Sequence, residues 1–97
     1  MRVYLPAGLE ALVRLRGGQD VRGDAVVPDS DDEQDEFDAL STAAEQGDVV
    51  IAADVEQPDS PVTFDRVASF HLDADGSGDV AWYAPQELDQ VIALLQN

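Results

Sequence analysis

The sequence predicts a single α/β (α+β) domain over residues 1–97, built as two layers from about three helices on a mixed sheet of four or five strands. Three observations carry this prediction: a near-continuous apolar run in mid-chain, two alternating segments around a glycine-rich turn, and apolar residues at helical spacing. Ninety-seven residues can bury one core without metals or disulfides. We expect the order β-α-β-α-β-β-β-α.

The first quarter of the chain predicts a strand, a helix and a short strand. Arg2–Leu5 (RVYL) is rich in residues that favour strands. An amphipathic helix follows it, and Gly17 and Gly18 are suitable residues to end that helix. Residues 25–27 are apolar and form a short strand candidate.

The segment Asp29–Asp38 (DSDDEQDEFD) holds seven acids in ten residues and predicts the start of a helix. Ser30 and Glu33 have the S-x-x-E spacing of a capping box, and carboxylates in a first turn are stabilised by the helix dipole. Apolar residues from Phe37 onward continue the helix, and Gly47 is a suitable place for it to end.

The apolar run Asp48–Val55 (DVVIAADV) suits a central strand that is buried on both faces. Helical connections usually join parallel strands, whereas the hairpin that follows must be antiparallel. This combination is the reason for expecting a mixed sheet.

Residues 68–72 and 80–84 alternate in polarity around a turn and predict a hairpin. By this alternation Trp82 enters the core, and Tyr83 faces outward beside His71. A helix is expected after Pro85, because apolar residues recur at helical spacing: Leu88, Val91, Ile92 and Leu95.

Negative charge dominates the composition: 21 Asp and Glu stand against five Arg, with no Lys, for a net charge of −16. Direct binding to nucleic acid or to an anionic membrane is therefore not expected. Solvation or adaptation to salt is the first interpretation of the charge, a basic protein partner the second and cation binding the third. With no cysteine, leader or membrane-spanning run, we expect a cytoplasmic monomer or homodimer.

Four segments carry a resemblance to a known family: MRVYLP (1–6), VVIAADV (49–55), VASFHLD (67–73) and WYAPQEL (82–88). Through them the chain resembles a family of small uncharacterised actinobacterial proteins, a domain of unknown function. Members of that family tend to have a longer acidic helical insertion in place of the turn at 73–79, and a longer first helix region. The resemblance supports the order of elements and implies no activity.

The hairpin turn also matches the front half of an EF-hand calcium loop. Asp73, Asp75 and Ser77 take the first three ligand positions, and the carbonyl of Asp79 supplies the next. The bidentate Glu of such a loop is replaced by Ala84, and the flanking segments are predicted strands. A plain hairpin turn is the first interpretation, and a weak calcium site is the alternative.

No catalytic motif is present, because the chain lacks a nucleophile elbow, a phosphate-binding loop and any histidine besides His71. We therefore expect a non-enzymatic protein-interaction module with no cofactor, of which a DNA-mimic-like inhibitor is one form. The candidate interaction residues are Tyr83, His71, Asp31, Asp32, Asp35 and Glu36. The alternative is a divalent-cation (Ca) binder that uses Asp73, Asp75, Ser77 and Asp79.

Overall fold

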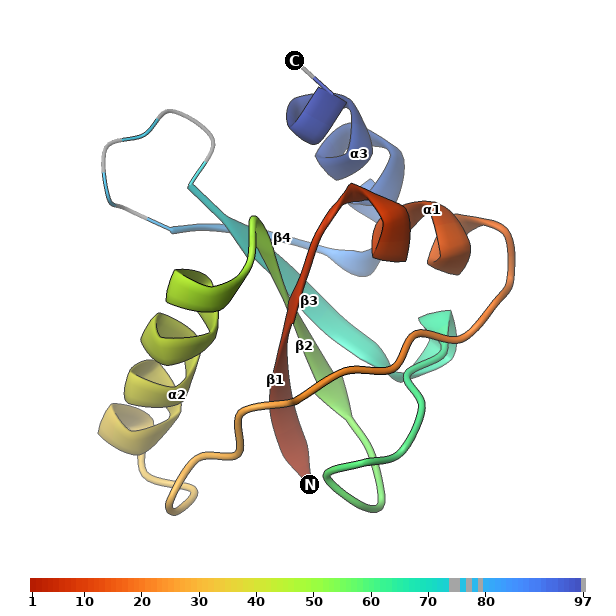
Figure 1. Cartoon of the computed structure of the whole chain (residues 1–97). Coiled ribbons are helices and arrows are strands. Elements are labelled where there is room, and N and C mark those ends of the chain that lie inside the picture. The colour runs from red at the N-terminus through yellow and green to blue at the C-terminus, as the bar shows by residue number, and fades with distance from the viewer. Residues whose placement is uncertain (74–75, 77, 79, 97) are drawn as a thin grey trace.

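The computed structural model describes residues 1–73, 76, 78 and 80–96. Within them lies a four-stranded sheet in the order β1 (Arg2–Ala7), β2 (Val49–Asp54), β3 (Val67–Leu72) and β4 (Ala81–Tyr83) (Figure 1). The helices are α1 (Leu9–Arg16), α2 (Glu33–Gln46) and α3 (Leu88–Gln96), with 3₁₀ turns at Phe64–Arg66 and Pro85–Glu87. The predicted α+β class is confirmed, as is the hairpin followed by a C-terminal helix. Within the described ranges, no helix is long and apolar enough to cross a membrane.

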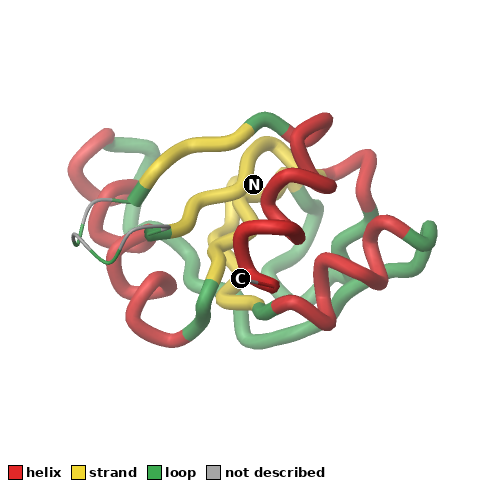
Figure 2. Tube along the Cα trace, turned by 90° about the horizontal axis from the view of Figure 1, so that it is seen from above, coloured by secondary structure: helices red, strands yellow, loops and turns green. Residues whose placement is uncertain are grey.

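Helices cover both faces of the sheet, so the molecule has three layers and the predicted two-layer arrangement is wrong. α1 and α3 pack together on one face, while α2 lies on the other face against β1 and β2 (Figure 2). The apolar stripes of the helices were recognisable in the sequence. The face of the sheet that each stripe covers was not, because β2 is apolar on both sides.

All three strand pairs are antiparallel, so the expected mixed sheet is also corrected. The rule for parallel strands assumes one helical return between them. Here the chain leaves β1 through α1, then runs back along the sheet in the irregular segment 17–32, and only then rises through α2 (Figure 1). The extra traverse places the start of β2 beside the end of β1, which makes the pair antiparallel.

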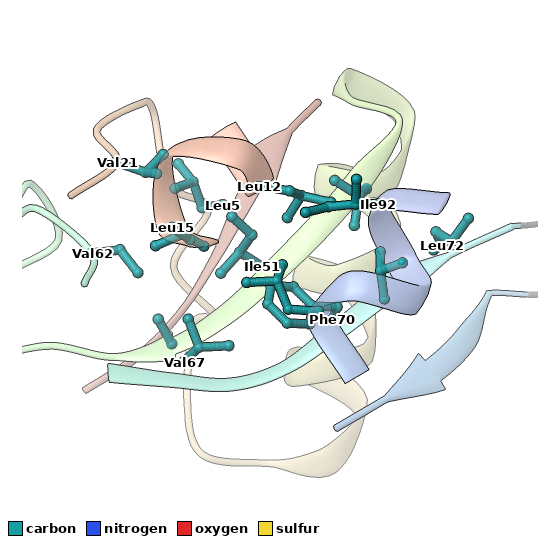
Figure 3. Close-up of a cluster of buried hydrophobic side chains, with 14 of the residues drawn as sticks. Leu5, Leu12, Leu15, Val21, Ile51, Val62, Val67, Phe70, Leu72 and Ile92 are labelled. Atoms are coloured by element: carbon teal, nitrogen blue, oxygen red, sulfur yellow. The ribbon is translucent and has the colours of Figure 1, made fainter. Parts of the chain in front are cut away.

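The larger core lies between the sheet and the pair α1 and α3. Phe70 and Ile51 from the sheet meet Leu12 of α1 and Ile92 of α3, all at most 2% exposed (Figure 3). Figure 3 shows these side chains converging from four different elements, with Leu5, Leu15 and Val67 extending the cluster along the sheet. Removal of this apolar surface from water is the main stabilising contribution of this layer.

The smaller core, on the opposite face, is built from small side chains. Ala39 and Ala43 of α2 pack on Tyr4, Val50 and Ala52 of the sheet. Their small size lets the helix lie close to the strands. Residues 49–53 of β2 are therefore buried on both faces, which confirms the prediction of a central buried strand.

Residues 25–27 form no strand, contrary to expectation. Val26 makes a single bridge to the outer edge of β1, in which Tyr4 N–H donates to the Val26 carbonyl (2.9 Å) and Val26 N–H donates to the Tyr4 carbonyl (2.8 Å). Pro28 prevents the pairing from continuing, since it has no N–H to donate. The segment therefore covers the β1 edge at one point.

The start of α2 also differs from the predicted capping box. The helix begins at Glu33 with Asp32 as its N-cap. Ser30 lies two residues earlier, where its hydroxyl accepts the Asp32 N–H (3.0 Å) and donates to Asp35 Oδ2 (2.6 Å). Serine therefore organises this turn from outside the helix.

Gly47 ends α2, as predicted, but for a different reason from the usual left-handed cap. Its φ is −151°, which is extended backbone that any residue adopts. A Cβ at this position would lie 2.7 Å from the Ala7 amide nitrogen and 2.8 Å from the Ala7 carbonyl oxygen. Glycine is required because the end of α2 lies directly against the main chain of β1.

We predict that Gly47→Ala destabilises the protein by about 1–3 kcal/mol, because the added methyl must push α2 and β1 apart. Chemical denaturation followed by circular dichroism measures the change. Gly17→Ala is the matched control, since a Cβ there meets its nearest neighbours at an ordinary 3.6 Å and φ is −81°. We expect the control to change stability by less than about 0.5 kcal/mol. Equal effects of the two variants would contradict this explanation.

We predict that Phe70→Ala costs about 3–5 kcal/mol of stability, because it leaves a cavity at the centre of the larger core. Phe37→Ala provides the comparison, since Phe37 is 60% exposed on α2 and its loss is expected to cost under about 0.5 kcal/mol. Denaturation midpoints of the two variants, measured side by side, test the assignment of the core.

Candidate interaction surface

Trp82 and Tyr83 face the opposite ways from those predicted. In the pairing of β3 with β4, Tyr83 lies opposite Phe70 and Trp82 lies opposite His71. Side chains directly across an antiparallel pair point to the same face. Tyr83 therefore packs against the larger core, whereas Trp82 is 61% exposed on the face that carries α2. The predicted outward Tyr83 face is thus replaced by an outward Trp82 face.

Ala84 explains why the sequence alternation predicts the wrong orientation for Trp82. Ala84 is buried, which in an uninterrupted strand would place Trp82 in the core as well. However, β4 ends at Tyr83, and Ala84 is the N-cap of the 3₁₀ turn, where its N–H donates to Glu87 Oε1 (2.9 Å). The backbone changes direction there, so the burial of Ala84 carries no information about Trp82.

His71 lies opposite Trp82 and forms a partly buried polar contact that the sequence did not indicate. Its Nε2 is 2.8 Å from the hydroxyl oxygen of Ser69, and Ser69 is 4% exposed. Both side chains face the α2 side of the sheet, opposite Val50 and Ala52. Burial, with a smaller effect of the Arg2 charge, lowers the pKa of His71 below its ordinary value of 6.5. The imidazole is therefore neutral at pH 7, and the enclosed Ser69 hydroxyl is not accessible to a substrate.

A small hollow of about 110 Å³ lies between the end of α2 and this part of the sheet. Its lining includes Ala44 of α2, His71 of β3, and the carboxylate residues Asp48 and Asp73. Phe37 and Leu40 share the side of α2 that carries Ala44, because they precede it by seven and four residues. This side of α2 therefore carries the exposed Phe37 near its start and the half-buried Leu40 and Ala44 further along.

The hairpin turn is closed by Asp73, whose Oδ2 accepts the N–H of Gly78 (2.8 Å). Gly76 and Gly78 have φ of 75° and 92°, the left-handed conformation that glycine adopts without strain. The other proposed cation ligands, Asp75, Ser77 and Asp79, lie outside the described residues. Among the residues that are described, no group of three His, Asp or Glu could hold a metal ion. Calcium binding by this turn stays a hypothesis.

The four acidic candidates at the start of α2 fall into two pairs. Asp31 and Asp32 are exposed to solvent. Asp35 and Glu36 are half-buried and hydrogen-bonded. Asp35 accepts the hydrogen bond from Ser30, and Glu36 Oε1 accepts one from the Tyr4 hydroxyl (3.4 Å). The second pair thus fixes the helix start in place, and the first pair projects from it.

None of these acids is neutralised by an arginine. The ion pairs among the described residues are Arg2–Asp54, Arg14–Asp20, Arg22–Asp20 and Arg16–Asp89. No Lys or Arg occurs between Arg22 and Arg66, the part of the chain that contains α2 and β2. The acidic segment 29–38 therefore retains an uncompensated negative charge at one end of α2.

We predict that protonation of His71 destabilises the fold. Because its folded pKa lies below the unfolded value of 6.5, the unfolded chain takes up a proton first as the pH falls. The contribution of the neutral imidazole is present above pH 6.5 and is lost as the pH falls toward the folded pKa. His71→Gln should therefore lose less stability than the wild type between about pH 7.5 and about pH 5.5. Denaturation curves at both pH values measure this; parallel losses in the two proteins would refute it.

Comparison with known proteins gives no functional assignment. No protein-family model, no curated protein and no solved structure matches this chain.

Proposed function

We propose that this chain is a non-enzymatic protein-interaction module of the cytoplasm, and that the acidic segment 29–38 binds a basic partner protein. The observation that carries the proposal is the concentration of seven carboxylates in this segment with no arginine paired to any of them. If the negative charge served only solubility, the carboxylates would not need to be concentrated at one end of a helix.

The geometry of the segment supports binding rather than internal stabilisation. The positive end of the α2 dipole favours carboxylates in its first turn, but this effect is confined to that turn. Asp31 lies before the helix and Asp32 at its N-cap, and both are exposed. An uncompensated field of one sign accelerates the encounter with a partner of opposite sign. A protein that mimics DNA toward a basic DNA-binding partner is one specific form of this function.

Phe37 adds an apolar element to the acidic segment. It is 60% exposed on α2, between Glu36 and Asp38 in sequence. Interfaces commonly combine an aromatic side chain that becomes buried with charges that set orientation at the rim. The partner surface that complements this segment is therefore basic, with a small apolar patch that covers Phe37.

We predict that neutralising the four acidic candidates weakens binding to a basic probe by about tenfold, since surface ion pairs of about 0.2–1 kcal/mol each would together contribute about 0.8–4 kcal/mol. The variant combines Asp31→Asn, Asp32→Asn, Asp35→Asn and Glu36→Gln. The probe is a twelve-residue synthetic peptide in which arginine alternates with valine or threonine, titrated by isothermal calorimetry at about 150 mM salt.

The matched control removes four charges elsewhere: Glu10→Gln, Asp24→Asn, Glu56→Gln and Asp59→Asn. These four side chains are exposed and take part in none of the ion pairs above, so both variants carry the same net charge. We expect the control to lose at most about threefold in affinity, the share due to long-range attraction. Equal losses in both variants would show that net charge alone drives the binding and would refute the proposal.

A further inference from the structure

The two edge strands of the sheet, β1 and β4, differ in whether another segment of the chain pairs with their outer side. The outer edge of β1 is bridged by Val26 through two main-chain hydrogen bonds. Nothing within the described ranges pairs with the outer edge of β4. An open edge presents unpaired N–H and C=O groups, to which a strand of another protein can add.

β4 lacks two of the features that usually protect an open edge. Natural proteins place charged residues or proline on such strands. β4 reads Ala81-Trp82-Tyr83 and has neither, although it is short. Ala81 and Trp82 are exposed, and Trp82 is the only tryptophan in the chain. A large aromatic side chain thus lies on the one edge that the described chain leaves open.

Charge identifies the kind of segment that this edge accepts. No Lys or Arg follows Arg66, while residues 67–97 contain five carboxylates. A second copy of this chain is a poor occupant, because each copy carries a net charge of −16. A cationic segment is favoured both by the net negative charge of the chain and by the indole face, which attracts arginine and lysine.

We infer that β4 receives an extended basic segment of a partner protein as a fifth strand, with an arginine or lysine of that segment lying over the Trp82 indole. The inference rests on the proposed function and states how the same basic partner is held. Side chains of a strand alternate between its two faces, so basic residues at every second position of the segment lie on the Trp82 side. The three residues of β4 allow few main-chain bonds, which makes the contact with Trp82 essential to affinity.

The test uses the alternating arginine peptide introduced above and a second form of it with N-methyl groups on alternate amides. N-methylation removes the donors of one edge and leaves the charge unchanged. We expect the N-methylated peptide to bind at least about tenfold more weakly, and Trp82→Thr to weaken binding of the unmodified peptide by a similar factor. Phe64→Thr, which removes another exposed aromatic ring, should change affinity less than about twofold. Amide NMR shifts should concentrate at residues 81–83.

Three results would overturn strand addition: equal binding of the two peptides, unchanged affinity in Trp82→Thr, or self-association of the chain through Trp82 in sedimentation experiments. The four-acid variant separates this inference from the proposed function. If that variant loses binding while Trp82→Thr retains it, the acidic segment acts alone and strand addition is wrong. If Trp82→Thr loses binding while the four-acid variant retains it, strand addition stands and the acidic segment is not the binding site.

Discussion

Burial of β2 on both faces is the constraint on which the rest of the structure depends. Residues 49–53 are all buried, so neither face of this strand can be left to water. One face is covered by α1 and α3 with large side chains, and the other by α2 with alanines. The close approach on the second side explains why Gly47 must lie against Ala7 without a side chain. Three layers follow from the composition of one strand.

The same arrangement determines where the sheet is exposed. α2 packs on β1 and β2, at one side of the sheet, and it is the only helix on that face within the described chain. β3 and β4 therefore keep part of this face uncovered, where His71 is half-buried and Trp82 is exposed. Because α2 also carries the acidic segment, the uncovered strands and the uncompensated charge lie on the same side of the molecule. The two features share one face but lie at opposite edges of the sheet, the start of α2 on β1 and Trp82 on β4.

Much of the fold could be predicted from local patterns. The wrong predictions concern features that depend on contacts between segments distant in sequence, or on where an element ends. The strands, the three helices and the buried status of β2 depend on periodicity and composition, which are local. The antiparallel sheet depends on the extended return of residues 17–32, which has no local signal of its own. The orientation of Trp82 is set by the pairing of β4 with β3, and the sequence alternation misassigned it because that alternation included Ala84, which lies beyond the end of β4. The acidic candidates were visible as residues, but only the structure separates the solvent-exposed Asp31 and Asp32 from the tethered Asp35 and Glu36.

The exposure of Trp82 has a consequence for how this molecule can be observed. Its single indole is in contact with water in the folded state, so we expect its fluorescence emission in the native protein to be close to that of an unfolded chain. Tryptophan emission should therefore change little when the core around Phe70 unfolds. The same indole responds strongly to anything that covers β4. For this protein, tryptophan emission is a spectroscopic probe of surface occupancy and not of folding.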